Sequence, residues 1–309
     1  MRICYYVTTL YKYKYHFYYD NLDWLAFGIE NKLKWKNFRL HLWLAKKSGV
    51  KIAIFPSGCR GELTKEEFSK FDKGNVCNNC GFKFCDDRIN KARLRLVNKY
   101  ADLVVGWATF NSPHFNYTHC KYKSLDLKLW KPNLKIPKKF ILPATNNLRI
   151  LHSFYNEDRL NGGKNIKGSP AIVAAINKLK EEGYKVEYMH ITDKASNEMR
   201  YYQSQSDIVV EQLIYGWWGS TGVETMCLGK PVVCYLRPSW KSFFLKQFPE
   251  HKALPIIEAT TLNVYQELKR LVVDKRYRQL KGRQSRNFAT RHYDSKLNTN
   301  KIIEILEAL

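Results

Sequence analysis

Residues 207–234 combine an acidic side chain with a glycine-rich loop, two features that can together bind a phosphorylated sugar. An apolar segment, 208–210, runs into a loop whose glycines are Gly216, Gly219 and Gly222. A short helix carrying Glu224 is predicted next. A strand, a glycine loop and a helix in this order point backbone N–H groups and the positive end of the helix dipole at the loop, which favours a phosphate. Glu224, one turn into the helix, can accept hydrogen bonds from sugar hydroxyls. For the glycines alone, an ordinary turn is the alternative interpretation.

A second candidate loop follows the predicted strand at 148–154. It carries three cations, Arg159, Lys164 and Lys167, among several glycines. A guanidinium and an ammonium there can neutralise a diphosphate and the charge that grows on it as a bond to it breaks. A solvated basic loop is the alternative. We expect His152, within the strand, near the same edge, although a lone histidine is more often structural.

Four of the eight cysteines cluster in the sequence at Cys59, Cys77, Cys80 and Cys85. Cys77 and Cys80 have the two-residue spacing of a metal knuckle, and four thiolates without an open position would bind structural zinc. An iron–sulfur cluster, free thiols and disulfides are the alternatives. We expect a metal to order the insert 57–90, which is too small for a substantial core of its own.

The elements that must position these loops alternate regularly from residue 148. Strands are predicted at 148–154, 184–191, 208–210 and 232–236, with helices at 171–179, 197–203 and 221–229. This alternation is typical of βαβ units and a parallel sheet, so the fold class is α/β. Right-handed crossovers bring the loops together at the carboxyl ends of the strands, where ligands bind in such folds. A short strand at 256–257 and basic helices from Leu262 complete this half.

The first half is less regular. Buried strands are predicted at 50–55 and 103–107, a basic amphipathic helix at 32–47, and an alternating Tyr-rich stretch at 11–19. The segment 121–147 is rich in Lys, Pro and Asn. We therefore predict a first domain at 1–130, a linker at 131–147 and a second domain at 148–309.

Two short sequence motifs, Glu224-Thr-Met-Cys and Gly229-Lys-Pro-Val, resemble the donor-binding signature of family-four glycosyltransferases of the GT-B fold. Gln212 together with Gly216-Trp217 is similar to members linked to polysaccharide synthesis. The family's common pattern has two Glu residues eight positions apart. Glu224 corresponds to the second, and Gly216 occupies the position of the first.

The resemblance implies two Rossmann-like domains and transfer of a sugar from a nucleotide-sugar donor to a glycan or lipid-linked acceptor, with retention of configuration. It implies that Glu224 holds the ribose and that Lys167 and Arg159 stabilise the leaving diphosphate, without a catalytic metal. The expected donor contacts also include Gly216, Gly219, Thr221, Gly222, Lys164 and His152. Such a fold opens with a strand and a glycine-rich turn. Because neither is found in the first 50 residues, we expect a shortened acceptor domain.

The net charge of +24 is spread along the chain. It suits nucleic acid, an anionic membrane face or phosphorylated substrates, and a lysine-rich solvated surface is the alternative. We find no long uncharged apolar run and no signal-peptide pattern, and we expect a cytoplasmic protein, peripheral at the inner membrane face. Two other functions stay open: a nucleic-acid-binding protein with a zinc knuckle, and a relative that binds a nucleotide-sugar without catalysing transfer.

Overall fold

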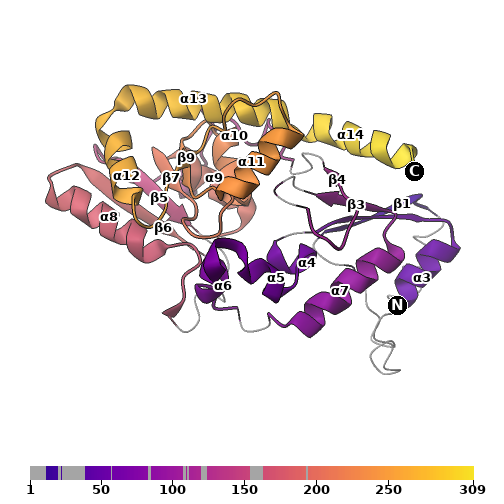
Figure 1. Cartoon of the computed structure of the whole chain (residues 1–309). Helices are drawn as coiled ribbons and strands as arrows, with labels where there is room; N and C mark the ends of the chain where they lie inside the picture. Colours follow the sequence, from indigo (N-terminus) through magenta and orange to yellow (C-terminus); the bar gives the residue numbers. More distant parts are fainter. Residues whose placement is uncertain are drawn as a thin grey trace. The chain divides into compact units, whose positions relative to one another are not determined.

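The chain forms two compact units in the computed structural model, each with its own parallel sheet (Figure 1). Unit 1 comprises Met1–Cys77, Phe84–Tyr122 and Asn300–Leu309, and unit 2 comprises Asn78–Lys83 and Lys123–Thr299. The structure describes residues 12–19, 22, 39–56, 58–82, 85–106, 109, 111–119, 124–153, 163–192 and 194–309. The segment 131–147, predicted as a linker, falls within unit 2.

Unit 2 contains a five-stranded sheet in the order β6-β5-β7-β8-β9, with every pair parallel. The strands are β5 (Leu148–Ser153), β6 (Val186–Ile191), β7 (Ile208–Val210), β8 (Val232–Cys234) and β9 (Ile257–Glu258). The helices are α8 (Ser169–Glu181), α9 (Ser196–Ser204), α10 (Ser220–Cys227), α11 (Pro238–Gln247), α12 (Val264–Val273) and α13 (Lys275–His292), and a 3-10 turn, η2, covers Lys138–Phe140. The predicted α/β class and the parallel sheet are therefore confirmed.

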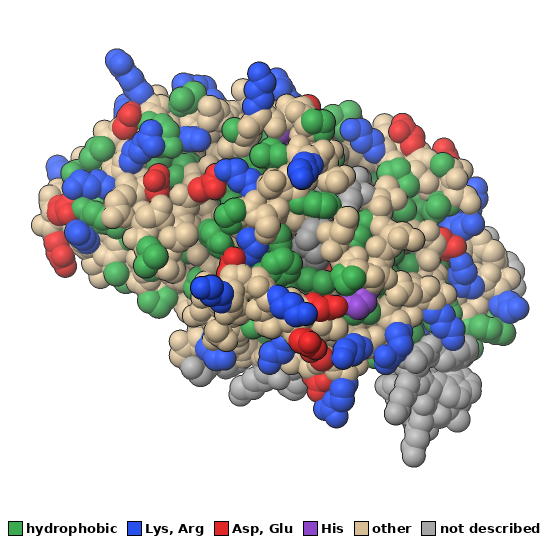
Figure 2. Space-filling model, viewed as in Figure 1, with side chains coloured by type: hydrophobic (Ala, Val, Ile, Leu, Met, Phe, Trp, Pro, Cys, Tyr) green, Lys and Arg blue, Asp and Glu red, His purple; other side chains and the backbone are tan. Residues whose placement is uncertain are grey.

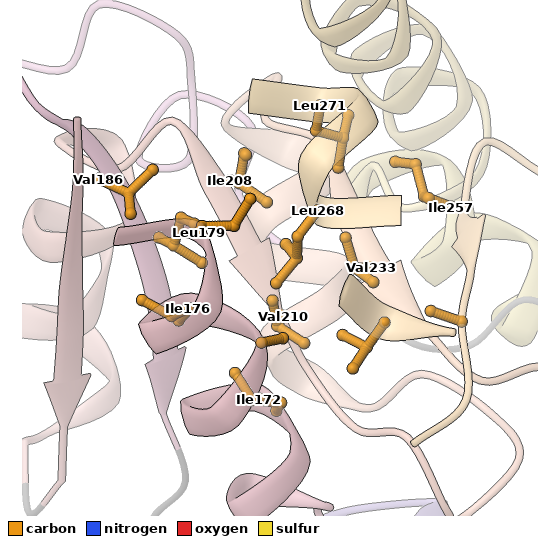
Figure 3. Close-up of a cluster of buried hydrophobic side chains, with 14 of the residues drawn as sticks. Ile172, Ile176, Leu179, Val186, Ile208, Val210, Val233, Ile257, Leu268 and Leu271 are labelled. Carbon is orange, nitrogen blue, oxygen red and sulfur yellow. The ribbon is translucent and has the colours of Figure 1, made fainter. Parts of the chain in front are cut away.

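The core of unit 2 follows from the spacing of its apolar residues. Val264, Leu268 and Leu271 recur at helical spacing in α12, and all three are buried against the sheet. Figure 3 shows Leu268 and Leu271 together with residues of α8 and of strands β7 and β8. Successive side chains of a strand point to opposite faces of the sheet. In β5, Ile150 accordingly joins this cluster, whereas Leu151 packs with residues of α9 on the other face. Both faces of the sheet are therefore covered, which explains why the strands are continuous apolar runs.

Unit 1 contains a four-stranded sheet in the order β1-β2-β3-β4, also parallel. Its strands are β1 (Tyr15–Tyr19), β2 (Lys51–Phe55), β3 (Leu103–Gly106) and β4 (Thr118–His119). The helical elements are α3 (Leu40–Lys47), α4 (Cys59–Glu62), α5 (Lys65–Ser69), η1 (Phe71–Gly74), α6 (Asn75–Asn78) and α7 (Asp87–Tyr100). The two-residue β4 was not predicted. The amino-terminal part of the predicted helix 32–47 lies outside the described residues.

The last helix, α14 (Ser295–Glu307), runs from unit 2 into unit 1. Within unit 1, Leu306 is buried in a cluster with Ala53 and Val105, and Ile302 and Ile305 pack against the same cluster. The terminal apolar turn of the sequence thus completes the core behind the sheet of unit 1.

Figure 2 shows how the basic side chains are distributed on one face of the molecule. On the face shown in Figure 2, Lys and Arg side chains alternate with acidic, apolar and neutral regions. This agrees with the even spread of charge along the sequence. A search of the described helices finds none that is both long and apolar enough to cross a bilayer.

Candidate functional site

The carboxyl ends of the strands of unit 2 border a cavity of about 420 Å³, which we call the edge cavity. Its walls come from the end of β5, the β6–α9 connection and the first turns of α9 and α10. The lining residues are Ser153, Ile191, Thr192, Lys194, Ala195, Ser196, Met199, Ser220, Thr221 and Glu224. This is the edge at which open parallel sheets bind their ligands.

Two helices begin at the edge cavity. Ser196 is the first residue of α9 and Ser220 is the first residue of α10, and both line the cavity. The N-cap residues, Ala195 and Gly219, have no side-chain oxygen that could cap these helices. The first N–H groups of a helix have no partner inside the helix and carry its partial positive charge. The two helix ends therefore give the cavity an anion-binding character.

Glu224 is held in the cavity wall by two donors from α9. The Ser196 hydroxyl donates to Oε1 at 3.2 Å, and the Gln203 amide donates to Oε2 at 3.2 Å. Glu224 is buried yet still lines the cavity. Each carboxylate oxygen can accept more than one hydrogen bond, so Glu224 retains the capacity to receive hydroxyl groups of a ligand.

A second buried carboxylate, Glu211, lies directly after β7 and was not predicted. Its Oε1 accepts the N–H of Gly219 at 2.5 Å, beside the positive end of α10. A Cβ atom on Gly219 would lie 2.8 Å from this oxygen. A Cβ atom on Gly222 would overlap Oε2 of Glu211 and lie 2.8 Å from Cβ of Trp218. These two glycines therefore make room for a carboxylate of the protein itself.

Gly216 occupies the position where the resembled signature has its other Glu. Its φ of +100° favours glycine, and a Cβ atom there would lie 3.0 Å from Cβ of Arg237. Arg237 is buried, donates to the Tyr215 carbonyl at 3.1 Å and lies 4.0 Å from the ring centre of Trp240. Gly216 does not line the edge cavity, so the loop here is built around an arginine instead of a carboxylate.

The loop after β5 is held in place by hydrogen bonds to its backbone groups. Asn165 Oδ1 accepts the N–H groups of Lys167 and Ser169, each at 3.1 Å, and the Lys167 carbonyl accepts the N–H of Leu213 at 3.0 Å. The last bond joins this loop to the one that follows β7. Lys164 is exposed, and Arg159 lies outside the described residues.

His152 is fully buried between β5, β7 and α8. Its Nδ1–H donates to the Val210 carbonyl at 2.8 Å, and Nε2 accepts from the Ser169 hydroxyl at 2.7 Å. Burial lowers the pKa of His152 to about 3, and the positive charges of Lys167 and His190 contribute to this decrease. The neutral ring therefore fixes the start of α8 to the sheet.

Lys167 also affects the pKa of a buried thiol in unit 2. Burial and the charge of Glu211 raise the pKa of Cys234 at the end of β8, and the charge of Lys167 opposes that rise. The main chain of Lys167 is fixed by the bond from its carbonyl to the N–H of Leu213, and a contact of its ammonium group with a donor stays a prediction.

The predicted site residues thus have different positions. Thr221 and Glu224 line the edge cavity, Gly219 is the N-cap residue of α10, and Gly222 and His152 contribute to the structure behind the cavity. Lys164 and Lys167 lie on the adjoining loop. Their assignment as donor-binding residues, together with that of Arg159 and Gly216, remains a prediction. Four residues at or behind the cavity were not predicted: Lys194, Ser196, Gln203 and Glu211. Of these, only Glu211 has a clear sequence signal, as a charged residue at the end of an apolar strand.

The predicted metal ligands Cys59, Cys77 and Cys85 belong to unit 1 and Cys80 to unit 2, and all four are half-buried. Among the described residues, no group of three ligand atoms within 4.8 Å of one another includes these thiols. The four-cysteine metal site is therefore not confirmed and stays a prediction.

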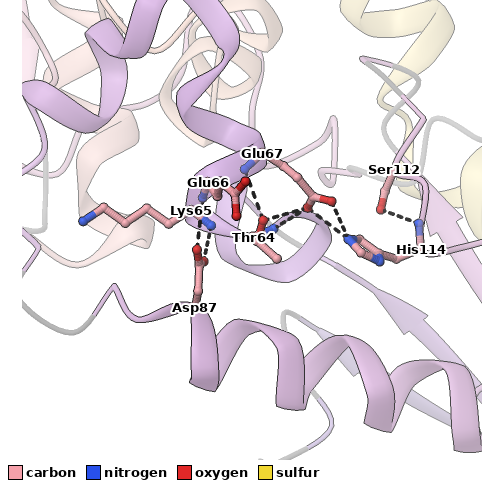
Figure 4. Close-up of polar contacts among 7 residues, drawn as sticks. All are labelled: Thr64, Lys65, Glu66, Glu67, Asp87, Ser112 and His114. Carbon is pink, nitrogen blue, oxygen red and sulfur yellow. Dashed lines mark hydrogen bonds and ion pairs between the residues drawn. The ribbon is translucent and has the colours of Figure 1, made fainter.

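Polar contacts organise the same part of unit 1 (Figure 4). Thr64 and Glu67 form a reciprocal capping box at the start of α5. Glu67 also contacts His114 Nε2 at 3.0 Å, and Asp87 accepts backbone N–H groups of the same helix. Burial alone would raise the pKa of Glu67, but the hydrogen bonds from Thr64 and His114 outweigh it and lower that pKa.

Comparison with solved structures identifies the fold. HepE from Anabaena, in complex with UDP and glucose, superposes with a TM-score of 0.60 at 14% identity, covering 99% of this chain and 81% of HepE. Sucrose-phosphate synthase from Thermosynechococcus elongatus gives 0.60 at 12% identity, covering 96% of this chain and 74% of that one. A trehalose-6-phosphate synthase gives 0.53 at 11% identity, covering 100% and 78%. No protein-family model matches the chain, and no curated protein matches it.

These neighbours are glycosyltransferases with two Rossmann-like domains, and this chain has their GT-B fold. The predicted fold is therefore confirmed across nearly the whole chain. At 10–14% identity the likeness concerns the fold, so the activity must be argued from the site.

Proposed function

We propose that this protein is a glycosyltransferase that binds a nucleotide-sugar in the edge cavity of unit 2 and transfers the sugar to a glycan or lipid-linked acceptor. The observation that carries the proposal is the position of Glu224, whose carboxylate lies in a cavity wall next to the beginnings of two helices. One cavity thus offers an acceptor for hydroxyl groups and a binding region for phosphates.

A uridine nucleotide is the first donor to test, because HepE was solved with UDP and with UDP-glucose. In the proposed complex, Glu224 accepts hydrogen bonds from the two ribose hydroxyls. The N–H groups at the start of α10 face the diphosphate, which suits the positive end of that helix. Lys194, at the cavity wall, adds a cation that the sequence analysis had not considered.

The transfer step requires stabilisation of a leaving group. The bond between the anomeric carbon and the diphosphate oxygen breaks, its electron pair goes to the diphosphate, and an acceptor hydroxyl forms the new bond to the anomeric carbon. The proton of that hydroxyl ends on the released nucleotide or in solvent. We assign Lys167, near the strand ends, and Arg159 to neutralise the growing phosphate charge. We also propose retention of configuration at the anomeric carbon.

One alternative has a specific observation in its favour. The loop at Gly216 packs on Arg237 and brings no carboxylate to the cavity. A protein of this kind could bind a nucleotide-sugar without transferring it. On the face shown in Figure 2, basic side chains alternate with acidic and apolar ones, which gives nucleic-acid binding no specific support.

The acceptor and the location belong to the same proposal. A net charge of +24 suits a peripheral position at an anionic membrane face, where lipid-phosphate acceptors are found. We therefore propose a lipid-linked or glycan acceptor in polysaccharide synthesis, on the cytoplasmic side. Co-sedimentation with anionic and neutral vesicles tests this part separately from donor binding.

Two measurements on the full chain test the proposal. The first is a thermal-shift series with UDP, GDP and ADP, in which one nucleotide should raise the melting temperature in a concentration-dependent way. No stabilisation by any of the three would contradict donor binding. The second is release of the nucleotide from its sugar in the presence of candidate acceptors. Stabilisation without release for any donor and acceptor pair would favour the binding protein without transfer activity.

A further inference from the structure

A second cluster of potential ligands lies elsewhere in unit 2. One ligand atom each from Glu250, His251 and His292 can be chosen so that all lie within 4.8 Å of one another. Glu250 and His251 belong to the turn after α11, and His292 is the last residue of α13. Neither the edge cavity nor the four cysteines include any of the three residues.

The spacing of the cluster fits a small divalent metal ion. Zinc binds imidazole nitrogen and carboxylate oxygen at about 2.0–2.2 Å, so two ligand atoms of a tetrahedral site lie about 3.3–3.5 Å apart. His251 Nε2 is 3.5 Å from Glu250 Oε1. The rings of His251 and His292 meet edge to face, with their centres 4.2 Å apart. Small side-chain rotations would bring the three atoms to ligand distance.

The surroundings also favour a bound cation. His292 ends an 18-residue helix, and the carbonyl end of a helix carries a partial negative charge. Phe288 contacts both rings, at 5.0 Å from His251 and 4.7 Å from His292, which limits access of water on that side. Glu250 is half-exposed at 52%, so a ligand can enter from solvent. Two imidazoles, one carboxylate and an accessible side match zinc sites that have three protein ligands and an open fourth position.

We propose that Glu250, His251 and His292 bind one divalent transition-metal ion, with zinc as the reference ion and water completing the coordination. The ion would join the turn after α11 to the end of α13. Behind it, Phe288 packs on Trp218 at 6.4 Å, and the indole N–H of Trp218 donates to the Tyr293 hydroxyl at 3.1 Å. Trp218 immediately precedes Gly219, so the metal would brace the inner side of the glycine loop.

This inference does not depend on the proposed enzymatic activity, and its test measures the metal directly. Full-length protein is stripped with a chelator, titrated with zinc against a chromophoric competitor, and analysed for bound metal after dialysis. We expect one bound zinc that depends on this cluster. The exposed position of Glu250 makes Glu250→Gln a substitution that should leave the fold intact, and His251→Gln is the second variant.

Both variants should weaken zinc binding by at least about tenfold, because even residues that only orient a ligand contribute that much. The matched control is Cys77→Ser combined with Cys80→Ser, which should keep the zinc assigned here. Cobalt should give the visible absorption of a site with nitrogen and oxygen ligands in the wild type and lose it in Glu250→Gln. The proposal is overturned if no zinc binds, if either Glu250→Gln or His251→Gln binds zinc like the wild type, or if the cysteine control removes this zinc.

Discussion

The glycine loop of unit 2 and the cysteine-containing segment of unit 1 are organised by different forces. In unit 2 the loop lies over a sheet whose apolar residues interlock with α8 and α12. In unit 1 the segment from Cys59 to Cys77 folds as short helices, with a capping box at the start of α5 and a contact between Glu67 and His114. A repeating apolar pattern determines the first region, whereas individual polar partners determine much of the second.

Apolar periodicity in the sequence therefore predicts the first region better than the second. Periodicity reports burial, so it is informative where burial dominates. A capping box is also visible in sequence, but a contact such as that between Glu67 and His114 joins residues 47 positions apart and leaves no local pattern. Substitutions in the two units can test whether apolar packing and individual polar contacts contribute to stability in this way.

Leu268→Ala should have the largest effect on stability. Leu268 is completely buried in the core of unit 2, so its truncation should lower the free energy of unfolding by about 2–5 kcal/mol. Chemical denaturation measures the change. Leu262→Ala is the matched control, because Leu262 is 89% exposed and should change the stability little. Equal effects at both positions would contradict the assignment of the core.

Gly222→Ala should be the next most severe. The added methyl group would meet the carboxylate of Glu211 and the side chain of Trp218, and overpacking of this kind costs about 1–3 kcal/mol. We also expect weaker binding of UDP, since the loop must shift. Gly183→Ala is the control for binding: its φ of +83° strains the backbone, so it also destabilises the protein, but Gly183 does not line the edge cavity. Unchanged stability and UDP binding in Gly222→Ala would show that the loop is not closely packed.

Glu62→Gln should change the pH dependence of stability. Burial raises the pKa of Glu62 to about 8, and the neighbouring Tyr117 side chain opposes this only in part. The folded state therefore binds the proton more tightly than the unfolded state, so stability is full below a pH of about 4.5 and declines as pH rises toward about 8. One proton contributes at most about 1.4 kcal/mol per pH unit.

The free energy of unfolding, measured by denaturation at several pH values in this range, should change less with pH for Glu62→Gln than for the wild type. Glu66→Gln, which removes a neighbouring exposed carboxylate, should keep the wild-type slope. An identical slope in Glu62→Gln would show that Glu62 does not titrate in this window.

Glu67→Ala should have the smallest effect. It removes one half of the capping box and the contact with His114, which we expect to cost about 1 kcal/mol. Hydrogen exchange of the α5 amides measures the loss locally, with Glu66→Ala as the control on the same helix. Faster exchange throughout unit 1 in both variants would contradict a local role for the capping box.

Much of unit 2 could be predicted from its sequence, because the apolar strands and amphipathic helices alternate without interruption. The GT-B fold was also predictable, since Glu224 and Gly229-Lys-Pro-Val carry a recognisable pattern. The partners of Glu224 were not, because Ser196 and Gln203 come from another helix and nothing in their neighbourhood marks them. The glycine loop was predicted to bind a phosphate, and the structure shows that Gly219 and Gly222 also leave room for the Glu211 side chain.

In unit 1 the sequence predicted β2 and β3 as buried runs but not β4. Two residues, Thr118 and His119, are too few to show a period, and only pairing with β3 defines the strand. The metal site expected from the cysteine spacing depends on how four side chains converge, and spacing alone does not determine this. Folding of an irregular segment is decided by such tertiary contacts.

The most direct test of the donor site is a calorimetric titration of UDP into the wild type, Glu224→Gln and Glu258→Gln. Glu258 lies at the end of β9 and is exposed, so its variant controls for loss of a carboxylate at the same sheet edge. Glu224→Gln should raise the Kd of UDP by about tenfold or more, the worth of a hydrogen bond to a charged group, while Glu258→Gln binds like the wild type. Equal affinity of wild type and Glu224→Gln for UDP would contradict the account.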